Sequence, residues 1–260
     1  MAIHQTAIVD PDAQLGGDVT VGPFSIIEGG ASIGDGTRIG PHCVIRRGVT
    51  LGARCVLDVG VVLGSEPQDR KFRGEESFVR IGDDNILREY VTIHRATGEG
   101  EFTQVGDNNF LMAYTHLGHN VRIGSGIQIA SFTGISGHCT IDDFANIGGF
   151  TGVHQYVTIG RMCMIGGCSR VTRDVPPFTT VVGNPAELCG INVIGLARRG
   201  VSEEQQMALR RAFRAIFRSD QNTSDAIAAL RAHGPLPEMV EEFVEFIERI
   251  DEGRRGRQGN

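Results

Sequence analysis

The chain has 260 residues, enough for one large domain or two modest ones. Its net charge of −6 argues against a general affinity for nucleic acids, and no apolar run approaches the roughly 18 residues of a membrane span. The N-terminus lacks the basic region and apolar core of a secretion signal, so we expect a cytoplasmic protein whose cysteines stay reduced. The 36 glycines and the absence of tryptophan are unusual for a helical or doubly wound protein.

A six-residue repeat runs from Ala7 to Val171 and begins with the blocks AIVDPD, AQLGGD and VTVGPF. The third residue is Val, Ile or Leu in 25 of the 28 blocks, and the first is small or β-branched in the opening blocks. Because alternate residues of a strand point to one side, both of these positions face inward, and the rest of the block turns the chain. Three blocks close one triangular coil, so residue n lies beneath residue n + 18. We therefore predict an all-β parallel β-helix over residues 1–185.

The three exceptions to the repeat are Asp69, Glu75 and Glu99. They fall in the polar segments 67–78 and 97–102, which we predict to be loops that leave the coil. Four cysteines occupy first positions, where a small inward core residue is a better interpretation than metal or redox chemistry: Cys43, Cys55, Cys139 and Cys163.

The repeat stops at the proline-rich segment RDVPPFTTVVGNPAE, and we predict a C-terminal α-helical domain over residues 186–260. Ser202 and Gln205 have the spacing of a capping box. We expect Thr223 to cap a second helix and Pro237 to open a third. The final ten residues are expected to be frayed.

Histidines gather on one predicted edge of the prism. By the repeat count, His119 lies beneath Gly137, with Gln155 above it, and Asn120 lies beneath His138. The edge collects four histidines and a glutamine: His116, His119, His138, His154 and Gln155.

Three interpretations of this edge are open from the residues alone. It could be a solvated structural edge. It could bind zinc, as in hexapeptide-repeat carbonic anhydrases, but the His-x2-His spacing and the lack of an added carboxylate or cysteine argue against a metal. In the third interpretation, which we favour, His119 takes a proton from a sugar hydroxyl that attacks a thioester, and the unshielded N–H of Gly137 stabilises the oxyanion.

The chain resembles the bacterial acyl-ACP:UDP-N-acetylglucosamine O-acyltransferases, a family that begins lipid A biosynthesis. The resemblance is carried in order by QDRKFRGE, REYVTIHRATGEG, NNFLMAYTHLGHN, GHCTIDDFANIGGFTGVHQYVTIG, GGCSRVTRDVPPF and GINVIGLARRG. It implies left-handed coils, a homotrimer with active sites between neighbouring prisms, and no cofactor. It also implies transfer of a (3R)-3-hydroxyacyl chain from acyl carrier protein to the glucosamine 3-hydroxyl of UDP-N-acetylglucosamine.

The resemblance assigns roles residue by residue. His119 would be the general base, and Gly137 would supply the oxyanion N–H. Met112 and Gly167 would lie along the acyl chain. The sugar nucleotide would be bound by loop residues, the histidine edge and the segment after the repeat: Gln68, Asp69, Lys71, His116, His138, His154, Gln155, Asn192, Arg198 and Arg199.

Two positions depart from the family pattern. A relative carries Asp directly after the catalytic His, where this chain has Asn120; an amide can orient the ring but supplies no negative charge. Some relatives carry His near the acyl tail where this chain has Pro185, so the acyl length stays open. Asp69 favours a hydroxyl over an amino acceptor.

The acidic carrier protein could dock on a basic patch made by Arg198, Arg199, Arg210, Arg211 and Arg214, although an exposed basic helix face explains the last three equally well. Other functions fit the repeat too: an acetyltransferase that uses an acyl-CoA donor, a trimeric metal-dependent hydratase, or a scaffold without catalysis. The N-acyltransferase of the same pathway is disfavoured, because its uridine-binding domain precedes the repeats and here the repeats begin within ten residues.

Overall fold

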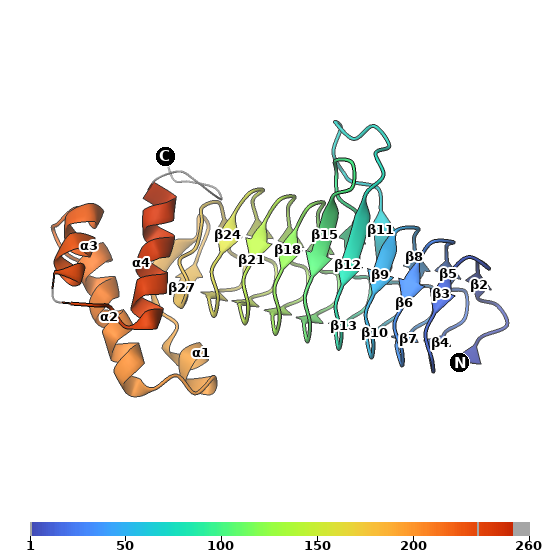
Figure 1. The fold of residues 1–260 in the computed structure, drawn as a ribbon, viewed down its shortest axis with the longest axis horizontal. Helices are drawn as coiled ribbons and strands as arrows, with labels where there is room; N and C mark the ends of the chain where they lie inside the picture. Colours follow the sequence, from blue (N-terminus) through green and yellow to red (C-terminus); the bar gives the residue numbers. More distant parts are fainter. Residues whose placement is uncertain (1, 233, 252–260) are drawn as a thin grey trace.

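The computed structural model describes residues 2–232 and 234–251, which form a triangular parallel β-helix followed by four helices (Figure 1). Three sheets make the sides of the prism, and we name them A, B and C. Sheet A contains β1 (Ala2–Ile3), β4 (Thr20–Val21), β7 (Arg38–Ile39), β10 (Val56–Leu57), β13 (Ile86–Leu87), β16 (Phe110–Leu111), β19 (Gln128–Ile129), β22 (Asn146–Ile147), β25 (Met164–Ile165), β27 (Thr179–Val182) and β28 (Glu187–Ile191).

Sheets B and C complete the triangle. Sheet B contains β2 (Ile8–Val9), β5 (Ile26–Ile27), β8 (Val44–Ile45), β11 (Val62–Ser65), β14 (Thr92–His94), β17 (His116–Leu117), β20 (Gly134–Ile135), β23 (Gly152–Val153) and β26 (Arg170–Val171). Sheet C contains β3 (Gln14–Leu15), β6 (Ser32–Ile33), β9 (Val49–Leu51), β12 (Phe78–Ile81), β15 (Phe102–Val105), β18 (Arg122–Ile123), β21 (Thr140–Ile141) and β24 (Thr158–Ile159). The chain passes from A to B to C in every coil, so the prism has three edges, which we name AB, BC and CA.

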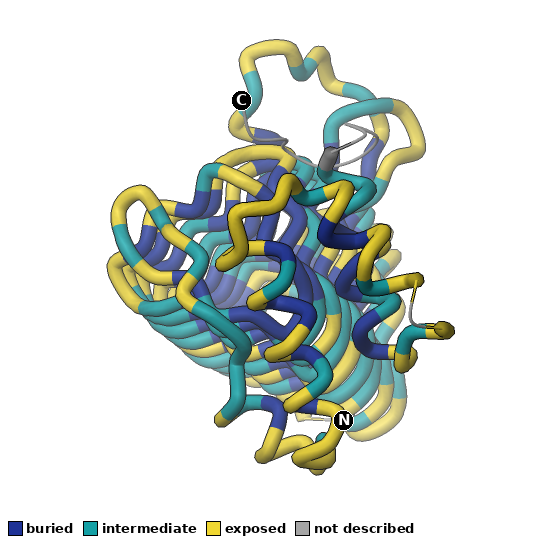
Figure 2. Tube along the Cα trace, turned by 90° about the vertical axis from the view of Figure 1, so that its left-hand side faces the viewer, coloured by how far each residue is buried: buried dark blue, intermediate teal, exposed yellow. Residues whose placement is uncertain are grey.

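The inward residues of the repeat fill the core of the prism, as predicted. Third-position residues such as Leu87, Leu111 and Leu117 are fully buried, and Figure 2 shows buried residues lining the inside of the stacked coils. Burying each such side chain contributes about 1.5–3 kcal/mol. The four first-position cysteines are free and buried, and burial raises the pKa of the Cys139 and Cys163 thiols to about 12. These thiols therefore stay protonated and unreactive at neutral pH.

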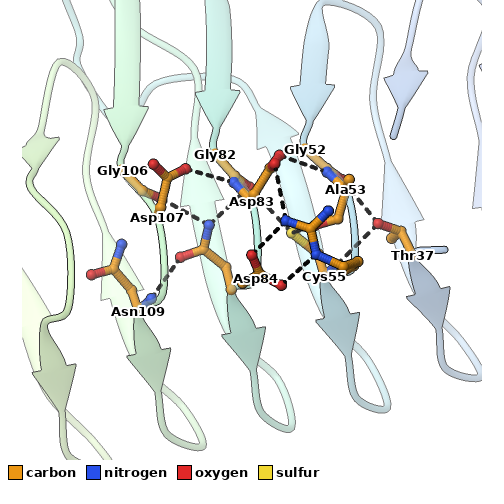
Figure 3. Close-up of polar contacts among 12 residues, drawn as sticks. Thr37, Gly52, Ala53, Cys55, Gly82, Asp83, Asp84, Gly106, Asp107 and Asn109 are labelled. Atoms are coloured by element: carbon orange, nitrogen blue, oxygen red, sulfur yellow. Dashed lines mark hydrogen bonds and ion pairs between the residues drawn. The ribbon is translucent and has the colours of Figure 1, made fainter. Parts of the chain in front are cut away.

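Edge CA is held together by side chains that bond to the backbone of the next coil (Figure 3). The Ala53 N–H donates to Asp83 Oδ1 at 2.8 Å, and the Asp83 N–H donates to Asp107 Oδ1 at 2.7 Å. Inside this row, the Asn85 amide donates to the Gly106 carbonyl of the next coil at 2.8 Å. These side chains satisfy backbone groups that a short strand leaves unpaired at a corner. We therefore interpret edge CA in this region as structural.

Two loops, residues 66–77 and 95–101, leave the coil at edge BC and project from the same side of the prism (Figure 1); we call them the first and second excursions. Their ends differ slightly from the predicted loops, because Phe78 and Phe102 pair with each other in β12 and β15 and stack their rings at 5.2 Å. The excursions change the stacking register: Val62 lies beside Thr92, and Thr92 lies beside His116. Beyond them the register returns to the repeat, with His116 beside Gly134.

A hairpin ends sheet A in the segment where we predicted helices. β28 pairs antiparallel with β27, so strand continues to Ile191 and the predicted boundary at residue 185 falls inside the hairpin. The returning strand bonds to the open edge that β27 would otherwise present. The helices are α1 (Val193–Arg198), α2 (Glu203–Phe217), α3 (Thr223–Arg231) and α4 (Glu238–Asp251).

Helices α2, α3 and α4 begin at or within one residue of the predicted positions. The Ser202 and Gln205 capping box is confirmed at the start of α2. The cap of α3 was placed one residue too late: Asn222, not Thr223, accepts the N–H of Asp225, at 2.8 Å, because an amide oxygen caps as well as a hydroxyl. α4 begins directly after Pro237, as predicted. Residues 252–260, which were expected to be frayed, lie outside the described residues. The helices pack around Phe178, Leu209 and Phe243 to form a second core.

Candidate active site

His119 lies at edge BC, between β17 and β18, and its ring is oriented by a hydrogen-bonded amide. Nδ1 of His119 donates to Asn120 Oδ1 at 2.9 Å. Thr97, in the second excursion, fixes that amide: its N–H and its hydroxyl each donate to Oδ1 at 2.9 Å, and the Asn120 Nδ2 donates to its carbonyl at 3.0 Å. A carbonyl oxygen only accepts, so Nδ1 carries the proton and Nε2 keeps a free lone pair. The arrangement presents Nε2 as a base.

Gly137 lies directly against that nitrogen. A Cβ atom placed on Gly137 would lie 2.6 Å from both Cε1 and Nε2 of His119, so a side chain here would displace the ring. The predicted stacking of residue 119 beneath residue 137 is therefore correct. Among residues 2–232 and 234–251, the N–H of Gly137 has no acceptor. A base and an unpaired amide donor thus lie side by side, as acyl transfer through an oxyanion requires.

Aromatic contacts extend the site along the edge. His138 meets the His119 ring edge-on at 5.0 Å, and Tyr156 stacks on His138 at 4.7 Å. Burial lowers the pKa of His138, the charge of His119 lowers it further, and the Asp69 carboxylate opposes this shift. Asp69 therefore lies close enough to His138 for the first excursion to border the site.

His94 belongs to the site, although the sequence analysis did not select it. Its ring meets the His116 ring edge-on at 5.0 Å, and its Nδ1 donates to the Glu66 carbonyl at 2.6 Å. His116 Nδ1 lies 2.8 Å from the Thr92 hydroxyl. Burial lowers the pKa of His116 to about 4 and also lowers that of His94. Both rings are neutral at pH 7, so they add no positive charge beside His119.

Acid should destabilise the fold through His116. The folded-state pKa is about 4, whereas an unfolded histidine titrates near 6.5, so only the unfolded chain binds the proton between these pH values. The contribution of His116 to the free energy of unfolding is therefore fully present above pH 6.5. It is lost as the pH falls toward 4, by up to about 3 kcal/mol. We expect His116→Gln to reduce this loss, measured by urea unfolding across the same pH range. His4→Gln is the control, and an equally steep dependence in both variants would contradict the assignment.

Other predicted ligands lie on the same edge. Lys71 donates its backbone N–H to Asp69 Oδ1 at 2.9 Å, and its side chain is exposed, as is that of Gln68. His154 and Gln155 are exposed one coil beyond His138, and His154 Nδ1 lies 3.3 Å from the Gln155 carbonyl. These exposed side chains lie where a ligand across edge BC would meet them.

Three residues that were predicted to bind the nucleotide, Asn192, Arg198 and Arg199, line a separate cavity of about 940 Å³. This cavity lies between α1 and the outer face of sheet A. The Arg199 guanidinium lies 3.9 Å from the centre of the Phe144 ring, and its Nη2 donates to the Gly126 carbonyl at 3.3 Å. Asn192 caps α1 by accepting the Gly195 N–H and donates to the Met162 carbonyl, so it also shapes the cavity wall. Arg198 and Arg199 offer the cationic forks that a pyrophosphate prefers.

One chain does not bring all predicted residues together. His119 and Gly137 lie at edge BC, whereas Arg198 and Arg199 lie over sheet A beside edge CA. The two predicted acyl-chain residues lie at edge AB: Met112 is half-buried and Gly167 is exposed. The filled core of the prism separates these surfaces. Within the described ranges, no group of three or more His, Cys, Asp or Glu side chains is placed to hold a metal, and no helix has the length and apolar character to cross a membrane.

Comparison with known proteins decides the family. A model described as UDP N-acetylglucosamine O-acyltransferase, domain 2, matches residues 174–257, and a bacterial transferase hexapeptide model matches 30–65 and 102–137. The acyl-(acyl-carrier-protein)–UDP-N-acetylglucosamine O-acyltransferase of Thermodesulfovibrio yellowstonii is 40% identical over 98% of this chain and 98% of its own. The chain belongs to the UDP-N-acetylglucosamine O-acyltransferase family. The Synechocystis protein of the same name is 48% identical over 76% of this chain and 72% of its own.

Solved structures of the O-acyltransferase family share the whole fold. The enzyme from Bacteroides fragilis superposes with a TM-score of 0.93 at 38% identity and covers 98% of both chains. That from Francisella novicida gives 0.92 at 32% identity and covers 98% of this chain and 92% of its own. The predicted left-handed parallel β-helix with C-terminal helices is therefore confirmed.

Proposed function

We propose that this O-acyltransferase transfers a (3R)-3-hydroxyacyl chain from acyl carrier protein to the glucosamine 3-hydroxyl of UDP-N-acetylglucosamine, the first step of lipid A biosynthesis. The relatives' names state the donor class and the acceptor. The observation that carries the chemistry is the free Nε2 of His119 against the unpaired N–H of Gly137. The six unpaired thiols suit the reducing cytoplasm in which we place the reaction.

The proposed reaction needs only groups of this chain and the two substrates. Nε2 of His119 takes the proton of the 3-hydroxyl as its oxygen attacks the thioester carbonyl. The new oxyanion accepts the Gly137 N–H. When the carbonyl reforms, the C–S bond breaks, and the leaving thiolate accepts the proton that the imidazolium took from the 3-hydroxyl. The balance leaves an ester and a free thiol, so no cofactor enters the reaction.

We propose that a complete site needs a second copy of the chain. A substrate at edge BC cannot reach the Arg198 and Arg199 cavity of the same chain through the core. In a homotrimer, edge BC of one copy would face sheet A of the next, which brings the base and the nucleotide cavity together. Asp69 and Lys71, with Gln155 beyond them, would then meet the sugar from the edge.

The donor protein would dock on the helical end. Arg210, Arg211 and Arg214 are exposed on α2, and Arg198 and Arg199 lie beside the cavity. A row of exposed arginines attracts an acidic partner even though the whole chain is net negative. Met112 and Gly167 would contact the acyl chain at edge AB of the neighbouring copy, and Gly167 leaves room for a long chain there.

The decisive assay offers purified protein UDP-N-acetylglucosamine with a panel of 3-hydroxyacyl thioesters on either acyl carrier protein or coenzyme A. We expect ester formation with the carrier-protein donors and little with the coenzyme A donors. A clear preference for coenzyme A would instead favour the acetyltransferase alternative. Activity that chelation abolishes would favour a metal-dependent enzyme.

Asn120→Asp should retain acyl transfer within about tenfold and move the acidic limb of the kcat/KM profile to higher pH. A carboxylate 2.9 Å from Nδ1 favours the protonated ring, so the free base forms only at higher pH. The Asp also loses the donor to the Thr97 carbonyl, which offsets part of any gain. Asn120→Ala, which removes the orienting oxygen, is the comparison and should lose more than tenfold. A loss of that size in Asn120→Asp would contradict the proposed pairing.

A further inference from the structure

The floor of the cavity beside α1 is the outward-facing row of sheet A. The residues of this row alternate along their strands with residues that point into the core. Four of them line the cavity and are stacked in register, one from each successive strand: Gln128, Asn146, Met164 and Thr180. The row therefore places two amide side chains next to each other beneath any ligand that enters the cavity.

Asn146 is the more enclosed of the two amides. Its residue is half-buried, whereas Gln128 is exposed. Within residues 2–232 and 234–251, neither side-chain amide has a hydrogen-bond partner. Asparagine is also disfavoured in strands, so the stability of the sheet does not explain this residue. A half-buried amide without a partner in its own chain is costly, and a ligand that bonds to it removes the cost.

The walls around Asn146 suit the flat face of a nucleobase. Met162, Ile191 and Ile194 contribute apolar side chains, and Ile194 of α1 is 68% exposed, so its side chain is accessible to a ring in the cavity. A mainly apolar pocket with a few polar groups is typical of a site for a small organic molecule. Asn146 is one of those few polar groups.

The arginines indicate which end of the row holds the pyrophosphate. Arg199 donates to the carbonyl of Gly126, two residues before Gln128. Gln128 and Arg199 also line together a second cavity of about 460 Å³ next to the first. Gln128 therefore lies at the arginine end of the row, whereas Asn146 lies one coil further along, beside Met164. A nucleotide whose pyrophosphate meets the arginines would place its base over Asn146.

The edge of uracil matches a carboxamide. Its N3–H donates and its O4 accepts, and an amide offers an acceptor oxygen and a donor NH2 side by side. Cytosine has the reverse pattern, which the same amide matches after turning over. A carboxylate only accepts, so it can bond to the N4 amine of cytosine but repels O4 of uracil.

We propose that the Asn146 side chain hydrogen-bonds the N3–H and O4 edge of the uracil of the acceptor nucleotide. This assignment rests on the proposed function, because it takes the cavity beside α1 as the nucleotide site. It adds a base-binding residue that the sequence analysis did not select, and it leaves Gln128 at the pyrophosphate end.

The test measures the binding of UDP and of CDP by calorimetry, without an acyl donor. The two nucleotides share ribose and pyrophosphate, so the ratio of their dissociation constants depends on the base alone. Asn146→Asp keeps the size of the side chain and removes its donor. It should shift the ratio by at least about tenfold toward CDP while circular dichroism remains that of the wild type. Asn146→Leu, which removes donor and acceptor together, should weaken both nucleotides and leave the ratio near that of wild type.

Gln128→Glu is the matched control for charge. Its carboxylate lies one coil away at the arginine end, so it should weaken both diphosphates alike and leave the ratio unchanged. Thr20→Val, in the same row of sheet A but far from the cavity, should bind both nucleotides as wild type does. An unchanged ratio in Asn146→Asp, an equal shift in Gln128→Glu, or a wild type that binds neither nucleotide would overturn the proposal. A wild type that binds UDP but forms no ester would contradict the proposed function alone.

Discussion

Replacing His119 with alanine should lower kcat for acyl transfer by about 10²–10⁴-fold and change the KM for UDP-N-acetylglucosamine only a few-fold. The ring is expected to take a proton only in the transition state, so its loss affects the chemical step more than binding. Steady-state rates with a carrier-protein thioester measure both constants. His4→Ala, near the N-terminus and far from edge BC, is the control and should match wild type. Retention of more than a tenth of wild-type kcat would exclude His119 as the base.

Mixing two inactive variants should restore activity if the site is shared between copies. His119→Ala keeps the nucleotide cavity, and Arg199→Ala keeps the base. In trimers reassembled from equal amounts of the two, about a quarter of the sites would combine an intact His119 with an intact Arg199 from the next copy. We therefore expect activity to rise from near zero to roughly a quarter of wild type, measured after refolding the mixed chains together.

A second mixture provides the matched control. His119 and Gly137 lie against each other at edge BC of one chain, so each variant of this pair damages the same half-site. Mixed trimers of His119→Ala with Gly137→Ala therefore contain no intact edge, and they should stay inactive. If activity recovers in this control, or does not recover in the first mixture, the proposal that two copies share the site is wrong.

The repeat made most of the fold predictable, because an inward aliphatic residue in nearly every block leaves few other ways to bury the chain. Counting in coils of 18 residues also placed Gly137 over His119 without any structure. The count fails where the chain leaves the coil. Thr97 and His94 lie at the second excursion, across which stacked residues are 24 rather than 18 positions apart, so neither could be stacked on His119 by arithmetic.

The incorrect predictions of the α3 cap and of the domain boundary have local causes. Asn222 and Thr223 are adjacent and are both good caps, so the sequence pattern cannot choose between them. β28 follows a turn rich in glycine and proline that also suits a domain boundary, and only its pairing with β27 identifies it as a strand. The division of the site over two edges follows from the three-dimensional path of the coil and was implied in advance only by the family resemblance.

The stacking register also determines where related sequences should co-vary. Contacts along the prism join residues 18 positions apart after residue 103, but 24 apart across the second excursion and 30 apart across the first. Substitutions that compensate each other should therefore peak at these three separations in an alignment of relatives.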